Sequence, residues 1–157
     1  NKGIVINNLY EPPKKIFTIT DDSDFYFEEL FNDVKNKKNI CIVSMSSNAL
    51  EKIADGLKNK KINYVMHTAK TDDALKKNLE DVNNFWTKYQ VVLFSPTIES
   101  GIDFNEEHFH KIYSIITDGH MTCSQRQHLQ QIGRIRHVKD NNVLCLYSTK
   151  KDFRSLT

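Results

Sequence analysis

The sequence contains little of what marks several protein classes. Its 157 residues include only 5 Gly, 3 Pro and 3 Cys, a composition that excludes collagen-like, low-complexity and disulfide-rich scaffolds. No apolar run approaches the roughly 18 residues of a membrane-spanning helix, so we expect a soluble domain without a membrane partner. A chain of this length can bury a core without disulfides or a structural metal.

The cysteines and the first residues indicate a cellular compartment. Cys41, Cys123 and Cys145 are odd in number and form no C-x-x-C pair. Two of them lie in apolar runs, so we expect buried thiols in a reducing compartment. The start, Asn1-Lys2-Gly3, has neither an initiator Met nor a secretory leader. We therefore expect a piece of a longer intracellular protein, cytoplasmic or nuclear.

Positive charge is unevenly shared between lysine and arginine. The net charge is only +2, but 18 Lys stand against 4 Arg, and three of the four arginines fall between positions 126 and 136. Arginine presents planar, paired donors that fit phosphate oxygens better than an ammonium group does. This arginine-rich segment is therefore a candidate anion site.

Short apolar runs alternate with helical patterns along the chain. Strands are predicted at 16–19, 39–43, 62–66, 91–94, 112–116 and 143–147. Helices are predicted from the N-cap candidates at 21–23 to the lysine-rich end at 35–38, and at 49–57, 72–86 and 124–133. This alternation predicts an α/β fold with a mainly parallel sheet and helices on both faces. Residues 1–15 are interpreted as a connector and 16–157 as one domain. Ligands of such sheets bind beyond the carboxyl ends of the strands.

The segment 124–136 combines an apolar face with a basic face. Leu129, Ile132 and Ile135 recur every third residue and are expected to anchor it to the sheet, whereas Arg126, Gln130 and Arg134 share another face. Arg134 and Arg136 would point about 200° apart on a continuous helix. They can converge on one ligand only if the helix ends near Gly133. The alternative is a surface helix with an ordinary basic face.

The second candidate segment begins with the buried strand 91–94. Ser95 and Thr97 then place hydroxyl groups at the ligand edge of the sheet. Gly101 permits close backbone approach, and Asp103 offers an acceptor for a ribose or an arginine. The alternative is an ordinary exit from a strand into a turn.

Together, these segments resemble motifs V (95–103) and VI (130–136) of the second RecA-like domain of superfamily 2 helicases. The stretch from Asp81 through Trp86 to Thr97, the run 109–113 and the Gly-Arg-x-Arg form of motif VI are most similar to viral origin-binding-protein helicases of the herpesvirus type. The resemblance covers about residues 38 to 150. It implies a RecA-like fold and a role in ATP-dependent DNA replication.

The resemblance implies a nucleotide site between two domains. Arg134, Arg136 and Gln130 would be the catalytic residues facing the γ-phosphate, and Gly101, Asp103 and Gly133 would line the nucleotide cleft. Most superfamily 2 members carry the second arginine three positions after the first, where this chain has His137. The choice between Arg134 and Arg136 as the arginine finger is therefore open.

The same resemblance implies nucleic-acid contacts from loops that follow strands. Ser44, Ser46, Ser95, Thr97 and His67 are the candidates, since hydroxyl and amide donors bind phosphate without reading sequence. Ser46 or Ser47 could instead cap a helix. His67 could instead pack within a turn.

No P-loop of the form G-x-x-x-x-G-K-[ST] and no D-E-x-x box occur in the sequence. We therefore expect ATP and Mg²⁺ to be held mainly by an N-terminal RecA-like domain of the same protein, and no ATPase activity from this chain alone. His108, His110, His120 and Cys123 match no metal-binding spacing. Three alternatives stay open: a translocase or RNA helicase, a non-catalytic binding module, and an unrelated doubly wound enzyme.

Overall fold

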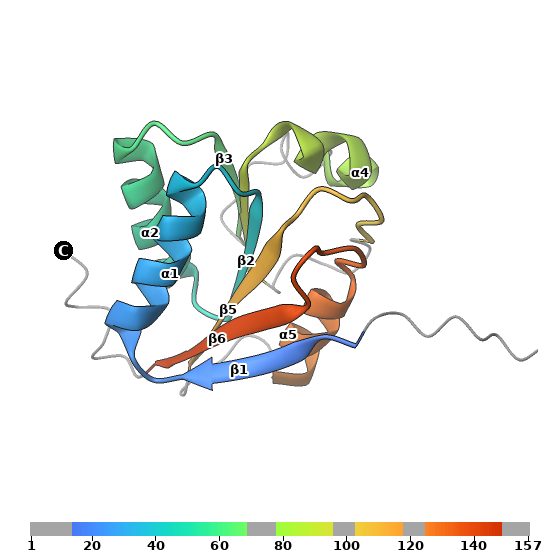
Figure 1. Cartoon of the computed structure of the whole chain (residues 1–157). Helices are drawn as coiled ribbons and strands as arrows, with labels where there is room; N and C mark the ends of the chain where they lie inside the picture. Colours follow the sequence, from blue (N-terminus) through green and yellow to red (C-terminus); the bar gives the residue numbers. More distant parts are fainter. Residues whose placement is uncertain (1–13, 69–77, 96–102, 118–124, 149–157) are drawn as a thin grey trace, which may run out of the picture.

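In the computed structural model, residues 14–68, 78–95, 103–117 and 125–148 are described. Within these ranges six parallel strands form one sheet in the order β1-β6-β5-β2-β4-β3. The strands are β1 (Ile16–Thr20), β2 (Ile40–Ser44), β3 (Tyr64–His67), β4 (Val91–Phe94), β5 (Lys111–Thr117) and β6 (Asn142–Ser148). The predicted α/β class, with a parallel sheet, is confirmed (Figure 1).

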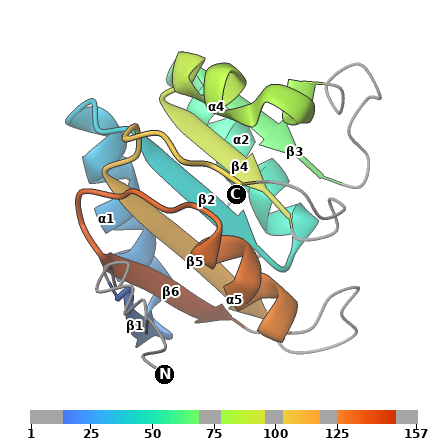
Figure 2. The same ribbon diagram turned by 90° about the vertical axis from the view of Figure 1, so that its right-hand side faces the viewer.

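Helices lie on both faces of this sheet (Figure 2). The helical elements are α1 (Ser23–Lys35), α2 (Ser47–Asn59), the 3₁₀ turn η1 (Asn78–Asp81), α4 (Val82–Phe85), the 3₁₀ turn η2 (Trp86–Lys88) and α5 (Gln125–Gly133). Helices α1 and α2 pack on one face, and α4 and α5 on the other. The inner strands β2 and β4 are therefore buried on both faces, as their continuous apolar runs require.

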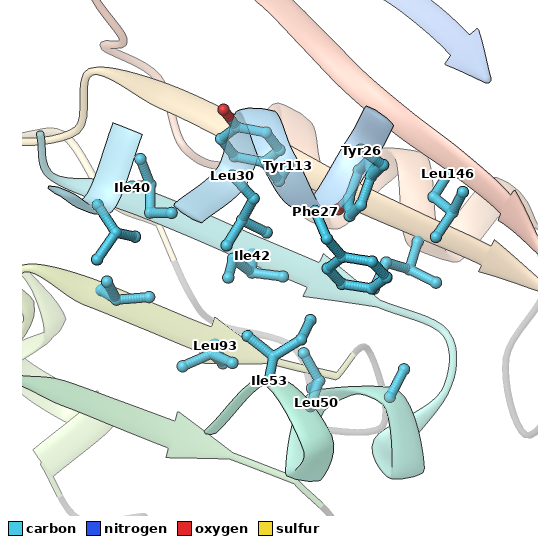
Figure 3. Packing of buried hydrophobic residues seen from close by; sticks show 14 of the residues in the cluster. Tyr26, Phe27, Leu30, Ile40, Ile42, Leu50, Ile53, Leu93, Tyr113 and Leu146 are labelled. Carbon is cyan, nitrogen blue, oxygen red and sulfur yellow. The ribbon is translucent and has the colours of Figure 1, made fainter. Parts of the chain in front are cut away.

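The core on the α1 and α2 face is built from alternate strand residues and two helical stripes. Ile42 and Leu93 point from adjacent strands toward Leu30 of α1 and Ile53 of α2 (Figure 3). The stripe predicted on α2 is fully confirmed, because its five apolar residues at helical spacing are all buried. Tyr26 and Phe27 of α1 join this core, whereas Phe25 remains exposed.

Trp86 occupies the centre of the core on the opposite face. It is fully buried, stacks on Phe94 with ring centroids 5.3 Å apart, and also contacts Phe104 and Phe109. Ile132 and Ile135 belong to the same cluster. This aromatic cluster packs two segments against the sheet: the turn η2, which precedes β4, and residues 104–109, which precede β5.

Local signals explain where α1 and α2 begin and end. Asp22 accepts a hydrogen bond from the Phe25 amide, and Ser46 accepts one from the Ala49 amide, so each side chain caps a helix start. The helices end in lysine-rich segments, where Lys37 and Lys61 adopt φ values of 60° and 57°. Cations at these ends also favour the negative pole of the helix dipole.

The predicted continuous helix over 72–86 is wrong for its described part. Residues 78–88 form the short succession η1, α4 and η2 instead. Asp81, Val82, Asn83 and Asn84 are weak helix formers, and burial of Trp86 determines the local geometry. The other elements match the predictions to within about two residues.

The buried thiols predicted at Cys41 and Cys145 are confirmed, and Cys123 lies outside the described residues. Within the described ranges, no helix is both long enough and apolar enough to cross a membrane. Residues 1–13 also lie outside them, so the boundary between a connector and the domain stays a prediction.

Candidate nucleotide and nucleic-acid interface

The arginine-rich segment 126–136 changes from helix to extended chain after Gly133, the position that the sequence predicted for the end of the helix. Helix α5 ends at Gly133, and the last amides form short-range bonds, from Arg134 to the Gln131 carbonyl and from Ile135 to the Ile132 carbonyl. The predicted helix end near Gly133 is therefore confirmed. A side chain at Gly133 would meet open space, so no described neighbour requires glycine there.

The extended chain after α5 pairs with the segment that follows Asp103. The Phe104 amide donates to the Arg134 carbonyl at 2.9 Å, and the Arg136 amide donates to the Phe104 carbonyl at 3.0 Å. Phe104 and Ile135, both fully buried, form the parallel bridge between the two segments. The two segments that the sequence marked separately are thus joined by backbone hydrogen bonds.

An ion pair closes the same contact at the surface. Arg136 Nε donates to Asp103 Oδ1 at 2.6 Å, with both side chains about half exposed. The hydrogen bond from Arg136 holds the pKa of the Asp103 carboxyl below its usual range, and it raises the pKa of the guanidinium. The predicted acceptor role of Asp103 toward an arginine matches this geometry.

A small pocket lies beside this ion pair. It is lined by Glu107, Phe109, Arg136, His137, Val138 and Lys139, with a volume of about 220 Å³. Sites that enclose a small molecule usually measure about 300–1,000 Å³. The pocket is therefore too small to enclose a nucleotide by itself.

The basic face of α5 is only partly as predicted. Arg126 and Gln130 are exposed and Arg134 is partly buried, so these three share a solvent-facing side. Leu129 was expected to anchor the helix but is 45 % exposed. His128 takes the inward position instead, four residues before the buried Ile132, so the assignment of Leu129 to the core is wrong.

His128 is a buried contact that the sequence pattern did not reveal. Its Nε2 lies 2.6 Å from the Ser114 hydroxyl of β5, and both side chains are fully buried. Burial lowers the pKa of His128 to about 4, so the ring is neutral near pH 7. This hydrogen bond ties α5 to the sheet. The one feature of the sequence that could have indicated the burial of His128 is its position four residues before Ile132, on the same face of the helix.

The serines after β2 support their own loop. The buried Ser44 hydroxyl donates to the Ser46 carbonyl and accepts from the Ser46 amide, at 2.9 and 3.0 Å. Ser46 is partly exposed and caps α2, as the alternative interpretation stated. Ser95 is buried, and its amide donates to the His67 carbonyl at 3.0 Å. Thr97 and Gly101 lie outside the described residues.

His67 lies in the interior rather than at the surface. It is fully buried, and its Nε2 accepts a hydrogen bond from Trp86 Nε1 at 3.1 Å. Burial lowers the pKa of His67 to about 4. This environment argues against the expected nucleic-acid contact and fits the packed histidine that was the alternative interpretation.

The candidate residues therefore occupy two places. Ser44, His67 and Ser95 lie at or just beyond the carboxyl ends of the adjacent strands β2, β3 and β4. Asp103 and Arg136 flank the bridge between Phe104 and Ile135, and both bridge residues belong to the core on the α4 and α5 face. The structure brings Asp103 and Arg136 together and leaves the strand-end residues as a separate group.

Comparison with known proteins identifies relatives among large viral proteins. The chain is 57 % identical over 150 residues to an uncharacterized putative helicase of Acanthamoeba polyphaga mimivirus, covering 94 % of this chain and 14 % of the relative. It is 53 % identical over 150 residues to a putative replication origin-binding protein of the same virus, covering 94 % and 18 %. The chain thus spans less than a fifth of the length of these relatives.

Solved structures support the fold. The C-terminal part of the Fun30 ATPase domain superimposes with a TM-score of 0.55 at 14 % identity, covering 83 % of this chain and 43 % of the other. This likeness concerns the fold, which agrees with the RecA-like architecture predicted from the sequence. A family model described as origin of replication binding protein matches residues 7–155. The chain therefore belongs to the origin of replication binding protein family.

Proposed function

We propose that the chain is the C-terminal motor domain of an ATP-dependent helicase that acts in DNA replication. The observation that carries this proposal is the joining of the segments at Asp103 and Arg136 by an ion pair and by the Phe104–Ile135 bridge. That contact fixes the backbone of Arg134 and Arg136 beside the exposed end of α5. The helicase and origin-binding names of the two mimivirus relatives agree with this role.

The geometry favours Arg134 as the residue that contacts the phosphate. Arg136 forms the hydrogen-bonded ion pair with Asp103, whereas Arg134 acts on the same carboxylate only through its charge, and within the described ranges no ion pair holds its guanidinium. Arg136 would then be a positioning residue that holds the two segments together. Gln130 is exposed one helical turn before Arg134, and Gly133 leaves open space beside it. Gly101 would line the same cleft.

ATP would be bound between this domain and a preceding RecA-like domain. A guanidinium at the γ-phosphate stabilises the negative charge that develops during hydrolysis. The pocket of about 220 Å³ is consistent with a site completed by a second surface. Mg²⁺ would be held mainly by the preceding domain, because the P-loop and the D-E-x-x box that bind it with the nucleotide do not occur in this sequence.

Nucleic acid would bind at the carboxyl edge of the sheet. Ser46 is partly exposed there, and the segment beginning at Ser95 and Thr97 follows the neighbouring strand β4. Hydroxyl and amide donors at these positions suit a phosphate backbone and carry no base preference. Buried Ser44 would shape the loop, and His67 is not retained as a contact. DNA is the proposed substrate, within an infected cell.

Strand separation by the longer protein that contains the P-loop tests this proposal. The wild type should separate DNA duplexes when ATP is supplied. Arg134→Ala should abolish separation, whereas Arg126→Ala, a change at an exposed arginine near the start of α5, should retain it. Separation of RNA duplexes alone would favour the RNA-helicase alternative, and unimpaired separation by Arg134→Ala would contradict the assigned site.

A further inference from the structure

Strand β1 forms one edge of the sheet and exposes large apolar side chains. Ile16, Phe17 and Ile19 are 64 %, 41 % and 66 % exposed. Among the described residues β1 pairs only with β6, and it borders the sheet in Figure 1. Native proteins usually cover or charge such an edge, because its unpaired backbone groups invite pairing with another strand.

The backbone groups that point outward from β1 can be identified. The Ile16 amide donates to the Asn141 carbonyl at 2.9 Å, so the polar groups of Ile16 face β6. Alternate residues of a strand direct these groups to opposite sides. The amide and carbonyl of Phe17 and of Ile19 therefore point away from β6, and no strand of the described part of the chain pairs with them.

The sequence around β1 is self-complementary in charge and in apolar residues when two copies are paired antiparallel. Residues 14–22 read Lys-Lys-Ile-Phe-Thr-Ile-Thr-Asp-Asp. In an antiparallel pair centred on Thr18, Phe17 lies opposite Ile19 and Lys15 lies opposite Asp21. The two outward-facing residues thus meet each other, and each end places a cation beside an anion.

The charges at the ends of β1 fit this pairing. Lys15 is partly buried, and burial followed by the charge of Arg136 lowers the pKa of its ammonium group. Asp21 is exposed at the other end of the strand, whereas Asp22 already caps α1. A carboxylate brought against Lys15 by a second copy would offset the repulsion from Arg136.

We propose that two copies of this chain associate through antiparallel pairing of their β1 strands about a two-fold axis at Thr18. The axis stands perpendicular to the sheet, so the two sheets become continuous and each keeps α1 and α5 on their own faces. Such an isologous contact needs only one self-complementary surface. It covers the exposed Ile16, Phe17 and Ile19. This inference does not depend on the proposed nucleotide site.

Measurement of the mass in solution, combined with charge-reversal variants, tests the pairing. Light scattering after size exclusion should give twice the 18.3 kDa chain mass at high concentration, falling on dilution. Lys15→Asp and Asp21→Lys each place like charges opposite one another and should each weaken the dimer at least tenfold. The double variant should restore it. Leu129→Asp, at an exposed apolar site on α5, is the control and should leave the dimer intact.

Cross-linking tests the register independently of affinity. Cα atoms of a non-hydrogen-bonded antiparallel pair lie about 4.5 Å apart, within the range for a disulfide. In a Cys123→Ser background, Thr18→Cys should form a disulfide-linked dimer on mild oxidation, and Thr20→Cys should not. A chain that stays monomeric at every concentration, a dimer indifferent to the charge variants, or equal cross-linking at positions 18 and 20 would overturn the proposal.

Discussion

Arg136 donates a hydrogen bond from Nε to Oδ1 of Asp103 at 2.6 Å, although 33 residues separate the two in sequence. The backbone bridge between Phe104 and Ile135 holds this pair in place. Arg136 is thereby hydrogen-bonded to the carboxylate, while Arg134, two residues earlier, acts on that carboxylate through its charge and forms no ion pair within the described ranges. The pair distinguishes two arginines that look equivalent in the sequence.

The first prediction concerns the ionisation of Asp103. Because Arg136 hydrogen-bonds its carboxylate, the pKa of Asp103 is depressed, and Arg136→Met should return it toward about 3.9. A depressed carboxyl pKa contributes stability above the unfolded-state pKa, and that contribution is lost as pH falls through the folded-state pKa. Carbon-detected NMR titration measures the shift. Arg126→Met should leave the pKa of Asp103 unchanged.

Acid should destabilise the fold through the buried histidines His67 and His128. Burial lowers the pKa of both His67 and His128 to about 4, whereas an unfolded histidine titrates near 6.5. Their contribution to stability is complete above about pH 6.5 and is lost as pH falls toward 4. At pH 5 each histidine should cost about 2 kcal/mol relative to pH 7.5. Urea unfolding at the two pH values measures this loss.

The variant His128→Gln separates the two contributions. It removes one titrating ring, so the difference in unfolding free energy between pH 7.5 and pH 5 should shrink by about half. An unchanged difference would mean that His128 does not titrate with a depressed pKa.

Two substitutions at Trp86 separate packing from hydrogen bonding. Trp86→Ala removes the largest buried side chain of its cluster and should lower the free energy of unfolding by about 3–5 kcal/mol. Trp86→Phe keeps an aromatic ring against Phe94 but leaves His67 Nε2 without its donor. It should cost less than Trp86→Ala. Equal losses in chemical denaturation would contradict the stacking role.

Periodicity predicted the fold well because buried strands and amphipathic helices repeat over many residues. The apolar stripe of α2 was identified completely. Leu129 was assigned to the core because it is apolar, yet His128 is buried there, since a hydrogen bond to Ser114 satisfies its ring. A partner 14 residues away on another element leaves no trace in local pattern.

The candidate site was only partly predictable for the same reason. The sequence marked Asp103, Arg134 and Arg136 as separate candidates and placed the helix end near Gly133. It could not show which arginine meets Asp103, because that depends on the bridge between Phe104 and Ile135. The sequence also did not settle whether His67 lies at the surface or in the interior. The structure places it in the interior, where it accepts a hydrogen bond from Trp86.

Relieving backbone strain at the end of α2 should stabilise the domain. Lys61 has a φ of 57°, a left-handed conformation that glycine adopts without steric cost. Lys61→Gly should raise the free energy of unfolding by about 0.5–1 kcal/mol, after allowing for glycine's greater freedom in the unfolded chain. Lys58→Gly, inside the helix, should lower it by about 1 kcal/mol. Destabilisation by both in urea titrations would refute the strain argument.

Steady-state ATP hydrolysis by the longer protein, with kcat and KM measured separately for Arg134→Ala and Arg126→Ala, tests the central claim most directly. The assignment of Arg134 to the developing phosphate charge predicts that Arg134→Ala lowers kcat by about 10³–10⁵ while KM changes little. Arg126→Ala should behave like the wild type. A kcat for Arg134→Ala within a few fold of that control would contradict the assignment.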